Sequence, residues 1–564
     1  MKKLFNLGAF EMKNNHGGHG ETRRLWFEKL ILSVKLRVLR GKILICWIAL
    51  ITILLSACIS SDSKVQWFPF GSNGDKGGAV EINFNEFKQV IDGFGGSNAW
   101  TRLPSDSEDA NELTKLLYSK TEGMGFTILR NRIPFRERLP GDVSSGLDDG
   151  FVVRKADHNY DYTVNPDGTK TFKLNWNSWD LSGTKSLIQN IKSLGNKGPE
   201  KLVILSTPWT PPNNRVTQWK ENITGVNARL NYVMDWSLPD RWGRLKRAHY
   251  NDYADLLADY VKNFESQMGA PLDILSVQNE PNWKADWECA YWDGIDLRDF
   301  IKIIAQRFPM KGITLGEDGL GIMMPEYENL NINFNNMIKP SLDDPESERI
   351  ITHIGMHQYN AGSDSSSRAG AREFPEIIES GKRFWQTEIS GSGRSIPTGH
   401  GILNALFWAR MIHWDLTLMQ TNAFLYWWLW TNTESTFDNG GSLVFYDGYE
   451  IIAADRLYAM GQYSRFIRPG WFRIASTVSP STGLYSSTYR NPNTKEIAIV
   501  MINERITPSV VSLNLTGAEF DRLEAWRTSE NEKLRSVGSR SINSNKTDVV
   551  LAPLSITTFY GSVK

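Results

Sequence analysis

The stretch that decides the fold is Leu275-Ser276-Val277-Gln278-Asn279-Glu280-Pro281. Its apolar, β-prone start predicts a strand. Pro281 ends that strand, because proline cannot donate to a sheet ladder and disfavours helical angles at the residue before it. The Glu280 carboxylate is therefore expected at the tip of a strand beside the Asn279 amide. In a barrel of parallel strands, this is the end that carries the chemistry.

A second apolar run ends in the same way. Arg383-Phe384-Trp385-Gln386-Thr387-Glu388 stops at a carboxylate and leads into a loop that begins Ile389-Ser390-Gly391. Two carboxyls about 5 Å apart suit a retaining glycosidase, in which one is the nucleophile and the other an acid and then a base; a wider separation suits inversion. The alternative is two unrelated surface glutamates, and only the pairing of strand tips argues against it.

Eight strand-like runs alternate with longer helical stretches between residues 93 and 467. This alternation predicts an α/β fold, a closed (β/α)8 TIM barrel rather than an open sheet. Glu280 then ends the fourth strand and Glu388 the seventh, so the two face each other across the mouth. The strands are expected at 94–99, 126–132, 201–207, 273–280, 312–316, 350–358, 383–388 and 423–429.

The pattern changes after Pro469-Gly470. Residues 468–564 hold short alternating strands separated by Gly, Asn, Pro and Ser turns, which predicts a β-sandwich. The strands in 79–92 have no place in the barrel and could complete that sandwich. Both chain ends would then form one side domain beside the barrel at 93–467.

The first 57 residues combine a basic leader with the apolar run 43–55, which has the length of a signal segment. It ends in Leu55-Ser56-Ala57-Cys58, and small residues before a cysteine resemble a bacterial lipoprotein cleavage site. We therefore expect an exported protein that is anchored to a bacterial membrane by a lipid on Cys58; an uncleaved anchor is the alternative. The Ser- and Gly-rich residues 58–78 are predicted to be a flexible tether.

Composition excludes several classes of protein. Lys+Arg and Asp+Glu both number 63, so the chain has no net positive charge that would favour a nucleic-acid partner. We also expect a monomer. The three cysteines form neither a disulfide framework nor a zinc cluster. Aromatic residues make up 12% of the chain, which suits either sugar binding or a large aromatic core.

The motifs together resemble a known family. Asn279-Glu280-Pro281 and the strand ending at Glu388 resemble the retaining barrel glycosidases of clan A. The runs at 92–97 (DGFGGS), 206–212 (STPWTPP) and 464–471 (SRFIRPGW) narrow the resemblance to glycoside hydrolase family 30, over residues 79–564. The resemblance implies that Glu280 is the acid/base and Glu388 the nucleophile. It implies no cofactor.

These roles agree with simple electrostatics. An ionised Glu388 is expected to raise the pKa of Glu280, which can then hold a proton at neutral pH. Once Glu388 forms the glycosyl ester its charge is lost, and Glu280 becomes the base that activates water. Asn279 is expected to bond the sugar 2-hydroxyl.

Other site residues follow from strand position. His357 and Tyr359 share one face of the sixth strand, and the family places such a pair near the nucleophile; a buried core histidine is the alternative. Arg130 resembles the substrate-side arginine of the family, with a structural ion pair as the alternative. A metal is not expected, because His353 and His357 lie on a strand without a third ligand. Four tryptophans fall at strand ends: Trp100, Trp209, Trp427 and Trp428. We expect sugar stacking by Trp209 and one of the adjacent pair, with the other in the core.

The sequence defines the sugar that the enzyme cleaves less narrowly than it defines the catalytic residues. The runs 281–289 and 464–470 look more like the xylanase branch than the glucosylceramidase branch. Members specific for glucuronoxylan carry aromatic residues after the nucleophile and arginines after the last strand, where this chain has Ile389-Ser390-Gly391 and Leu429-Trp430-Thr431; Arg394 could supply a charge. An endo-β-1,4-xylanase is predicted. The alternatives are a β-1,6-glucanase or galactanase, a glucosylceramidase-like β-glucosidase, or a non-catalytic carbohydrate-binding lipoprotein.

Overall fold

The computed structural model describes residues 68–564 with gaps at 72, 136, 139–150, 154–160, 213–233, 236–242, 284, 286–288, 330–333, 360–361, 367–373 and 392–398. The leader, Cys58, residues 59–67 and 72 of the tether, and Arg394 therefore lie outside the described residues. Residues 75–78 belong to a strand, β1 (Asp75–Ile91), so the flexible tether predicted there is wrong. Among the helices of the described residues, none has both the length and the apolar character needed to span a membrane.

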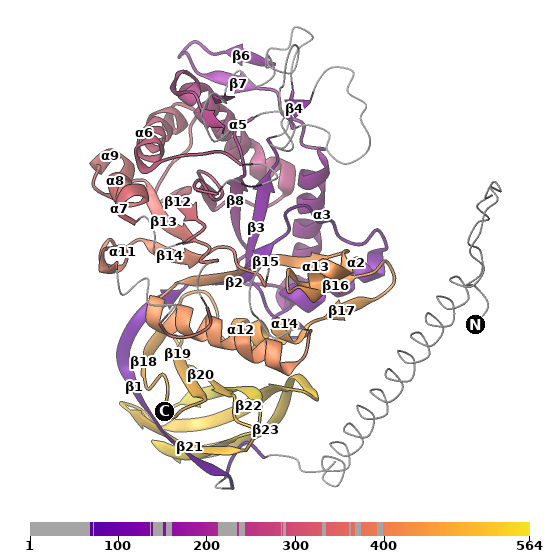
Figure 1. The fold of residues 1–564 in the computed structure, drawn as a ribbon, viewed down its shortest axis with the longest axis vertical. Helices are drawn as coiled ribbons and strands as arrows, with labels where there is room; N and C mark the ends of the chain where they lie inside the picture. Colours follow the sequence, from indigo (N-terminus) through magenta and orange to yellow (C-terminus); the bar gives the residue numbers. More distant parts are fainter. Residues whose placement is uncertain are drawn as a thin grey trace, which may run out of the picture. The chain divides into compact units, whose positions relative to one another are not determined.

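Eight parallel strands close into a barrel (Figure 1). Each strand pairs with the next in chain order, and the last returns to the first: Ala423 lies opposite Gly93 and Leu425 opposite Gly95. The strands are β2 (Gly93–Ser97), β3 (Ile128–Ile133), β8 (Val203–Pro208), β11 (Ile274–Ser276), β12 (Gly321–Tyr327), β13 (Ile351–Met356), β14 (Arg383–Gln386) and β15 (Ala423–Thr431). The predicted (β/α)8 barrel is confirmed.

Helices follow most strands and cover the barrel, as the apolar periodicity predicts. The longer ones are α2 (Ser107–Tyr118), α3 (Trp179–Ser193), α5 (Tyr250–Met268), α6 (Gly294–Met310), α12 (Ile402–Trp414) and α14 (Asp455–Ser464). The shorter ones are α7 (Phe334–Met337), α8 (Lys339–Leu342), α9 (Pro345–Glu348), α11 (Pro375–Glu379) and α13 (Glu434–Asp438). A hairpin of β16 (Ser442–Tyr446) and β17 (Ile451–Ala453) extends the sheet beyond β15.

The fifth strand lies elsewhere than predicted. Residues 312–316 form a turn after α6, with Gly312 and Gly316 at φ angles of 79° and 91°, a region that favours glycine. The strand is β12, whose seven residues are all buried. Proline is usually confined to edge strands or bulges, but Pro325 lies within this strand and pairs with Gly355 of β13. The strand predicted at 312–316 is therefore wrong, and residues 321–327 form the fifth strand instead.

Both chain ends meet in a second sheet, as predicted. Strand β1 (Asp75–Ile91) pairs antiparallel with β18 (Trp471–Ser476) and parallel with β21 (Ser509–Thr516) (Figure 1). The other strands are β19 (Leu484–Arg490), β20 (Glu496–Asn503), β22 (Phe520–Ser529), β23 (Glu532–Ser544), β24 (Lys546–Leu551) and β25 (Ser555–Val563).

These nine strands are continuous rather than split into two sheets. The sheet folds over one apolar core, because residues from its two halves share that core: Val511 and Leu551 from β21 and β24, with Met501 and Phe559 from β20 and β25. The result is sandwich-like packing by a single sheet.

Candidate active site

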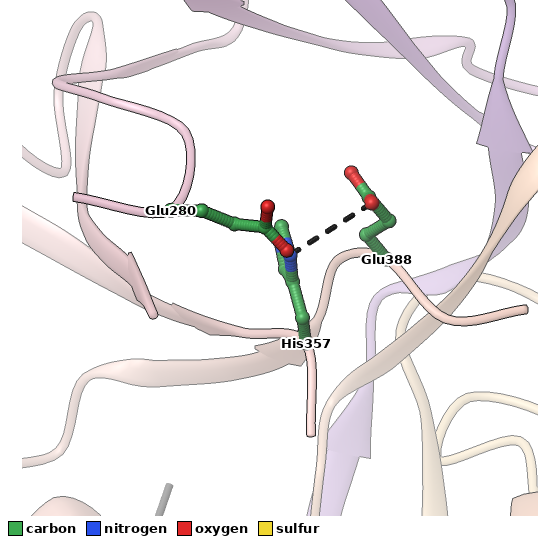
Figure 2. Close-up of side chains that lie close together, drawn as sticks. All are labelled: Glu280, His357 and Glu388. Carbon is green, nitrogen blue, oxygen red and sulfur yellow. Dashed lines mark hydrogen bonds and ion pairs between the residues drawn. The ribbon is translucent and has the colours of Figure 1, made fainter. Parts of the chain in front are cut away.

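The two predicted carboxylates meet at the mouth of the barrel. Figure 2 shows Glu280 and Glu388 facing each other with His357 beside them. The ligand atoms of these three side chains lie within 4.8 Å of one another. Both glutamates are almost fully buried, with exposed fractions of 6% and 5%. The expected juxtaposition of Glu280 with Glu388 is thus present, with one oxygen of each carboxylate within 4.8 Å of the other.

Glu280 reaches this position through a turn rather than a strand tip. Strand β11 ends at Ser276, four residues earlier, and Glu280 has a φ of 42°. Its backbone N–H donates to the carbonyl of Glu326 at 3.0 Å, and the N–H of Asn279 donates to that of Pro208 at 2.9 Å. These bonds hold a left-handed conformation that costs a non-glycine residue about 1–3 kcal/mol, as is common at functional sites.

Arg130 connects two acidic side chains and Asn279 through its guanidinium. It is fully buried in β3, and its guanidinium donates to Glu326 Oε1 at 3.0 Å, to Glu388 Oε2 at 2.6 Å and to Asn279 Oδ1 at 2.6 Å. The ion-pair alternative therefore describes Arg130, and the expectation that it lies on the substrate side is not met. Because the side-chain oxygen of Asn279 accepts from Arg130, the side-chain NH₂ group of Asn279 remains as the donor.

Glu326 is a site residue that sequence reasoning missed. It is fully buried at the end of β12, where Thr207 Oγ1 donates to its Oε2 at 2.8 Å. Burial opposes its ionisation, but the charges of Arg130 and His357 outweigh burial and hold its pKa at about 2. A signal was available: like the two predicted strands, the run at 321–326 is apolar and stops at a glutamate.

His357 and Tyr359 each contact one of the facing carboxylates. His357 Nδ1 lies 2.9 Å from Glu280 Oε1 and 3.9 Å from Glu388 Oε1, and the Tyr359 hydroxyl donates to Glu388 Oε1 at 3.0 Å. Burial disfavours an imidazolium, yet the charges of Glu388, Glu280 and Glu326 raise the pKa of His357 to about 9. His357 is thus fully buried, as a core histidine would be, but its ring is hydrogen-bonded to Glu280, the candidate acid.

The raised pKa of His357 predicts a stability change between pH 6.5 and about 9. The folded imidazole binds its proton more tightly than an imidazole of the unfolded chain, whose ordinary pKa is 6.5. Protonated His357 therefore stabilises the folded state by up to roughly 3 kcal/mol. This stabilisation is fully present below pH 6.5 and is lost as the pH rises through about 9. Relative to His357→Gln, the wild-type melting temperature should fall by several degrees between about pH 6 and pH 9.5. A difference that stays constant across this range, measured by calorimetry, would contradict the assignment.

Burial and neighbouring charges act in opposite directions on the pKa of Glu388. Burial raises the pKa of Glu388 and the charge of Glu280 acts in the same direction, while His357 and Arg130 oppose them. Sequence reasoning assigned this effect to Glu280 alone. Hydrogen bonds from Arg130 and Tyr359 favour Glu388 as the ionised member.

The same three side chains are close enough to be ligands of one cation. The surroundings of these side chains favour proton transfer over metal binding. An imidazole with a pKa of about 9 keeps its proton at neutral pH, whereas a metal ligand must be deprotonated. Glu388 is also already bonded to the Arg130 guanidinium.

A cleft of about 620 Å³ opens above the carboxylates. Aromatic side chains and small polar groups form most of its walls. Its lining comprises Trp209, Glu280, Trp283, Glu328, Tyr359, Glu388, Ser390, Trp427, Trp428, Thr436, Asn439 and Gly441. Sequence reasoning did not single out Trp283, Glu328 or the residues at 436–441 as site residues.

The tryptophans are arranged differently from the prediction. Trp427 and Trp428 both line the cleft with stacked rings 4.8 Å apart, so the expectation that one packs in the core is wrong. The pairing of β15 with β2 shifts between Tyr426 and Trp428, and such a bulge breaks the alternation of faces. Trp209 lines the cleft but is only 2% exposed. Trp100 packs edge-on against Trp209 and Trp427 at 5.4 and 5.9 Å.

Comparisons with known proteins agree with this geometry. No family model matches the chain. It is similar to the glucuronoxylanase XynC of Bacillus subtilis strain 168, at 24% identity over 487 residues that cover 85% of this chain and 91% of that protein. A solved xylanase of glycoside hydrolase family 30 subfamily 8, Xyn30A from Clostridium acetobutylicum, is 25% identical with a TM-score of 0.62, covering 86% of this chain and 99% of the other.

A second solved structure, the family 30 endoxylanase of Clostridium papyrosolvens, is 24% identical with a TM-score of 0.61 and covers 86% of this chain and all of the other. The sequence relative, the solved folds and the motifs of the chain point the same way. The chain is therefore similar in sequence and fold to glycoside hydrolases of family 30, and the relatives it resembles there are xylanases.

Proposed function

We propose that the protein is a retaining endo-β-1,4-xylanase in which Glu388 is the nucleophile and Glu280 the acid/base. The observation that carries this proposal is the buried carboxylate pair, whose oxygens lie within 4.8 Å of each other in an aromatic cleft. That separation leaves room for a sugar carbon but not for an additional water on the opposite face of the ring, as inversion would need.

The first step forms a glycosyl ester. A Glu388 oxygen attacks the anomeric carbon while Arg130 and Tyr359 hold the carboxylate in one orientation. Protonated His357 donates from Nδ1 to Glu280 Oε1, which leaves the other Glu280 oxygen to carry the proton to the leaving oxygen. The bond from the anomeric carbon to that oxygen breaks as the ester bond forms.

The second step releases the sugar with its original configuration. Glu388 is neutral as an ester, so Glu280, having lost its proton, takes one from water. The resulting hydroxide adds to the anomeric carbon from the face that the leaving group vacated, and the ester bond breaks. Two inversions give net retention. Proton NMR of the first products tests this: the β-anomer should appear first, and initial release of the α-anomer would refute the proposal.

Xylan is proposed because the sequence relative and the solved structures of the same family are xylanases. The charged residues in the described lining of the cleft are all acidic, namely Glu280, Glu328 and Glu388. An acidic side group on the polymer would meet like charge there. We therefore propose an uncharged xylan backbone as the substrate. Purified xylans with and without glucuronate, together with β-1,6-glucan, distinguish these substrates, and activity on β-1,6-glucan alone would refute the xylanase assignment.

Glu280→Gln is expected to separate the two steps. Glutamine cannot donate a proton to the leaving oxygen, so kcat/KM on xylan should fall by about 10²–10⁴-fold. An aryl xyloside with a good leaving group needs little acid assistance and should still form the ester, after which turnover stalls because no base activates water. Added azide needs no base and should restore turnover as a β-glycosyl azide. Fast turnover of the variant in plain buffer would contradict the acid/base role.

A further inference from the structure

Trp283 is fixed directly beside the acid/base. The turn that leaves Glu280 is closed by a hydrogen bond from the Trp283 N–H to the Glu280 carbonyl at 3.0 Å. The indole lines the cleft and remains 44% exposed, which is high for a tryptophan of this barrel. An open aromatic face of this kind suits the apolar face of a sugar ring.

Glu328 is the third carboxylate in the described lining of the cleft, and the double displacement makes no use of it. It follows β12, lines the cleft and is partly buried. Its backbone N–H donates to Asn282 Oδ1 at 3.3 Å, and its carbonyl accepts from the Tyr359 N–H at 3.0 Å. Asn282 belongs to the same turn as Trp283, so this turn and Glu328 are tied together. Burial raises the pKa of Glu328, and the charge of Glu280 acts in the same direction.

The order of strands places these two residues on one side of the reaction. Glu280 and Trp283 follow β11, and Glu328 follows the neighbouring strand β12. On the other side, Glu388 follows β14, while Trp427 and Trp428 belong to the neighbouring strand β15. An acid must reach the leaving oxygen and a nucleophile the anomeric carbon. The leaving sugar is therefore directed toward the wall that carries Glu280.

We propose that Trp283 and Glu328 form the binding site for the first sugar of the leaving group. Trp283 stacks on the ring of that sugar, and Glu328 accepts hydrogen bonds from its hydroxyl groups. The ligand is an uncharged, hydroxylated sugar unit, because an acidic one would face Glu328 and Glu280 together. The inference rests on the proposed function, since it takes Glu280 as the acid.

Two substrates separate this site from the catalytic centre. β-Xylobiosyl fluoride releases fluoride, so no sugar occupies the leaving-group side, whereas xylohexaose fills both sides of the cleft. The informative quantity is the ratio of kcat/KM on xylohexaose to kcat/KM on the fluoride. In Trp283→Ala and in Glu328→Ala we expect this ratio to fall by about tenfold or more, which corresponds to about 1.4 kcal/mol.

Two further variants sharpen the test. Glu328→Gln keeps an acceptor oxygen but loses the charge. Its ratio of kcat/KM values should therefore fall less than that of Glu328→Ala. The variant should also accept a glucuronate-bearing leaving sugar better than the wild type does. Tyr449→Ala is the matched control for loss of an aromatic ring, because Tyr449 is 91% exposed between β16 and β17 and is not among the described residues that line the cleft. Its ratio should equal that of the wild type.

The outcomes are distinguishable. An unchanged ratio in both alanine variants, with a wild type active on both substrates, would overturn the leaving-group site and leave the proposed function standing. Equal losses on the two substrates would also overturn it, because the residues would then act through the catalytic centre or the fold. A wild type inactive on both substrates would instead refute the proposed function.

Discussion

Glu388→Ala is expected to lower kcat/KM on xylan by at least about 10⁴-fold, because the variant lacks the carboxylate that forms the glycosyl ester. Arg130 keeps two of its three partners in this variant, Glu326 and Asn279, so the protein should remain folded. Binding of xylan should persist, since the aromatic walls of the cleft are unchanged. The measurements are initial rates and isothermal titration with a xylo-oligosaccharide.

The alanine variant also leaves space where the carboxylate stood. Azide can enter that space and attack directly, which should give the α-glycosyl azide, opposite to the β-product expected from Glu280→Gln. Glu112→Ala, an exposed glutamate on α2, serves as the matched control and should behave as the wild type. A Glu388→Ala protein that hydrolyses xylan at the wild-type rate would rule out Glu388 as the nucleophile.

Arg130→Met is expected to destabilise the protein by about 3–5 kcal/mol, the usual effect of leaving a buried charge without its partner. Glu326 and Glu388 would lose the guanidinium that neutralises them. Activity should fall as well, because Glu388 would lose a bond that favours its ionised form. Arg130→Lys should recover little, since one ammonium group cannot reproduce a planar fork that reaches three acceptors. Melting temperature and kcat/KM are the two readouts.

Arg307→Met provides the control for a lost ion pair away from the cleft. Arg307 on α6 donates to Asp255, a fully buried residue of α5. This variant should lower the melting temperature while kcat/KM of the folded enzyme stays near the wild-type value. If Arg130→Met behaves in the same way, with stability reduced and catalysis intact, the role given to Arg130 in holding Glu388 is wrong.

The parts of the site that lie close in sequence to an apolar strand could be predicted. Glu280 and Glu388 were found because each follows an apolar run, and the barrel brings the ends of its parallel strands to one face. The misplaced fifth strand did not disturb this result. A strand does exist between the fourth and sixth, at 321–327, so the number of strands separating Glu280 from Glu388 is unchanged.

The parts that depend on packing could not be predicted. The role of Glu326 depends on the side chains around it, Arg130 and Thr207, and its position at the end of an apolar run does not reveal these contacts. From its position in the sequence, Arg130 resembles an arginine that binds substrate. Only the structure shows that it is buried and donates hydrogen bonds to three neighbouring acceptors. Trp427 and Trp428 face the cleft together because of a bulge, which strand alternation alone does not reveal.

The most direct test of a covalent intermediate on Glu388 is trapping with 2-deoxy-2-fluoro-β-xylobiosyl fluoride. The 2-fluorine slows both steps, and the fluoride leaving group restores the first, so the glycosyl enzyme should accumulate. Mass spectrometry of the intact protein is expected to show one added fluoroxylobiosyl group, and peptide mapping should place it on Glu388. A label on any other residue, or no label while the enzyme turns the reagent over to an α-product, would contradict the account.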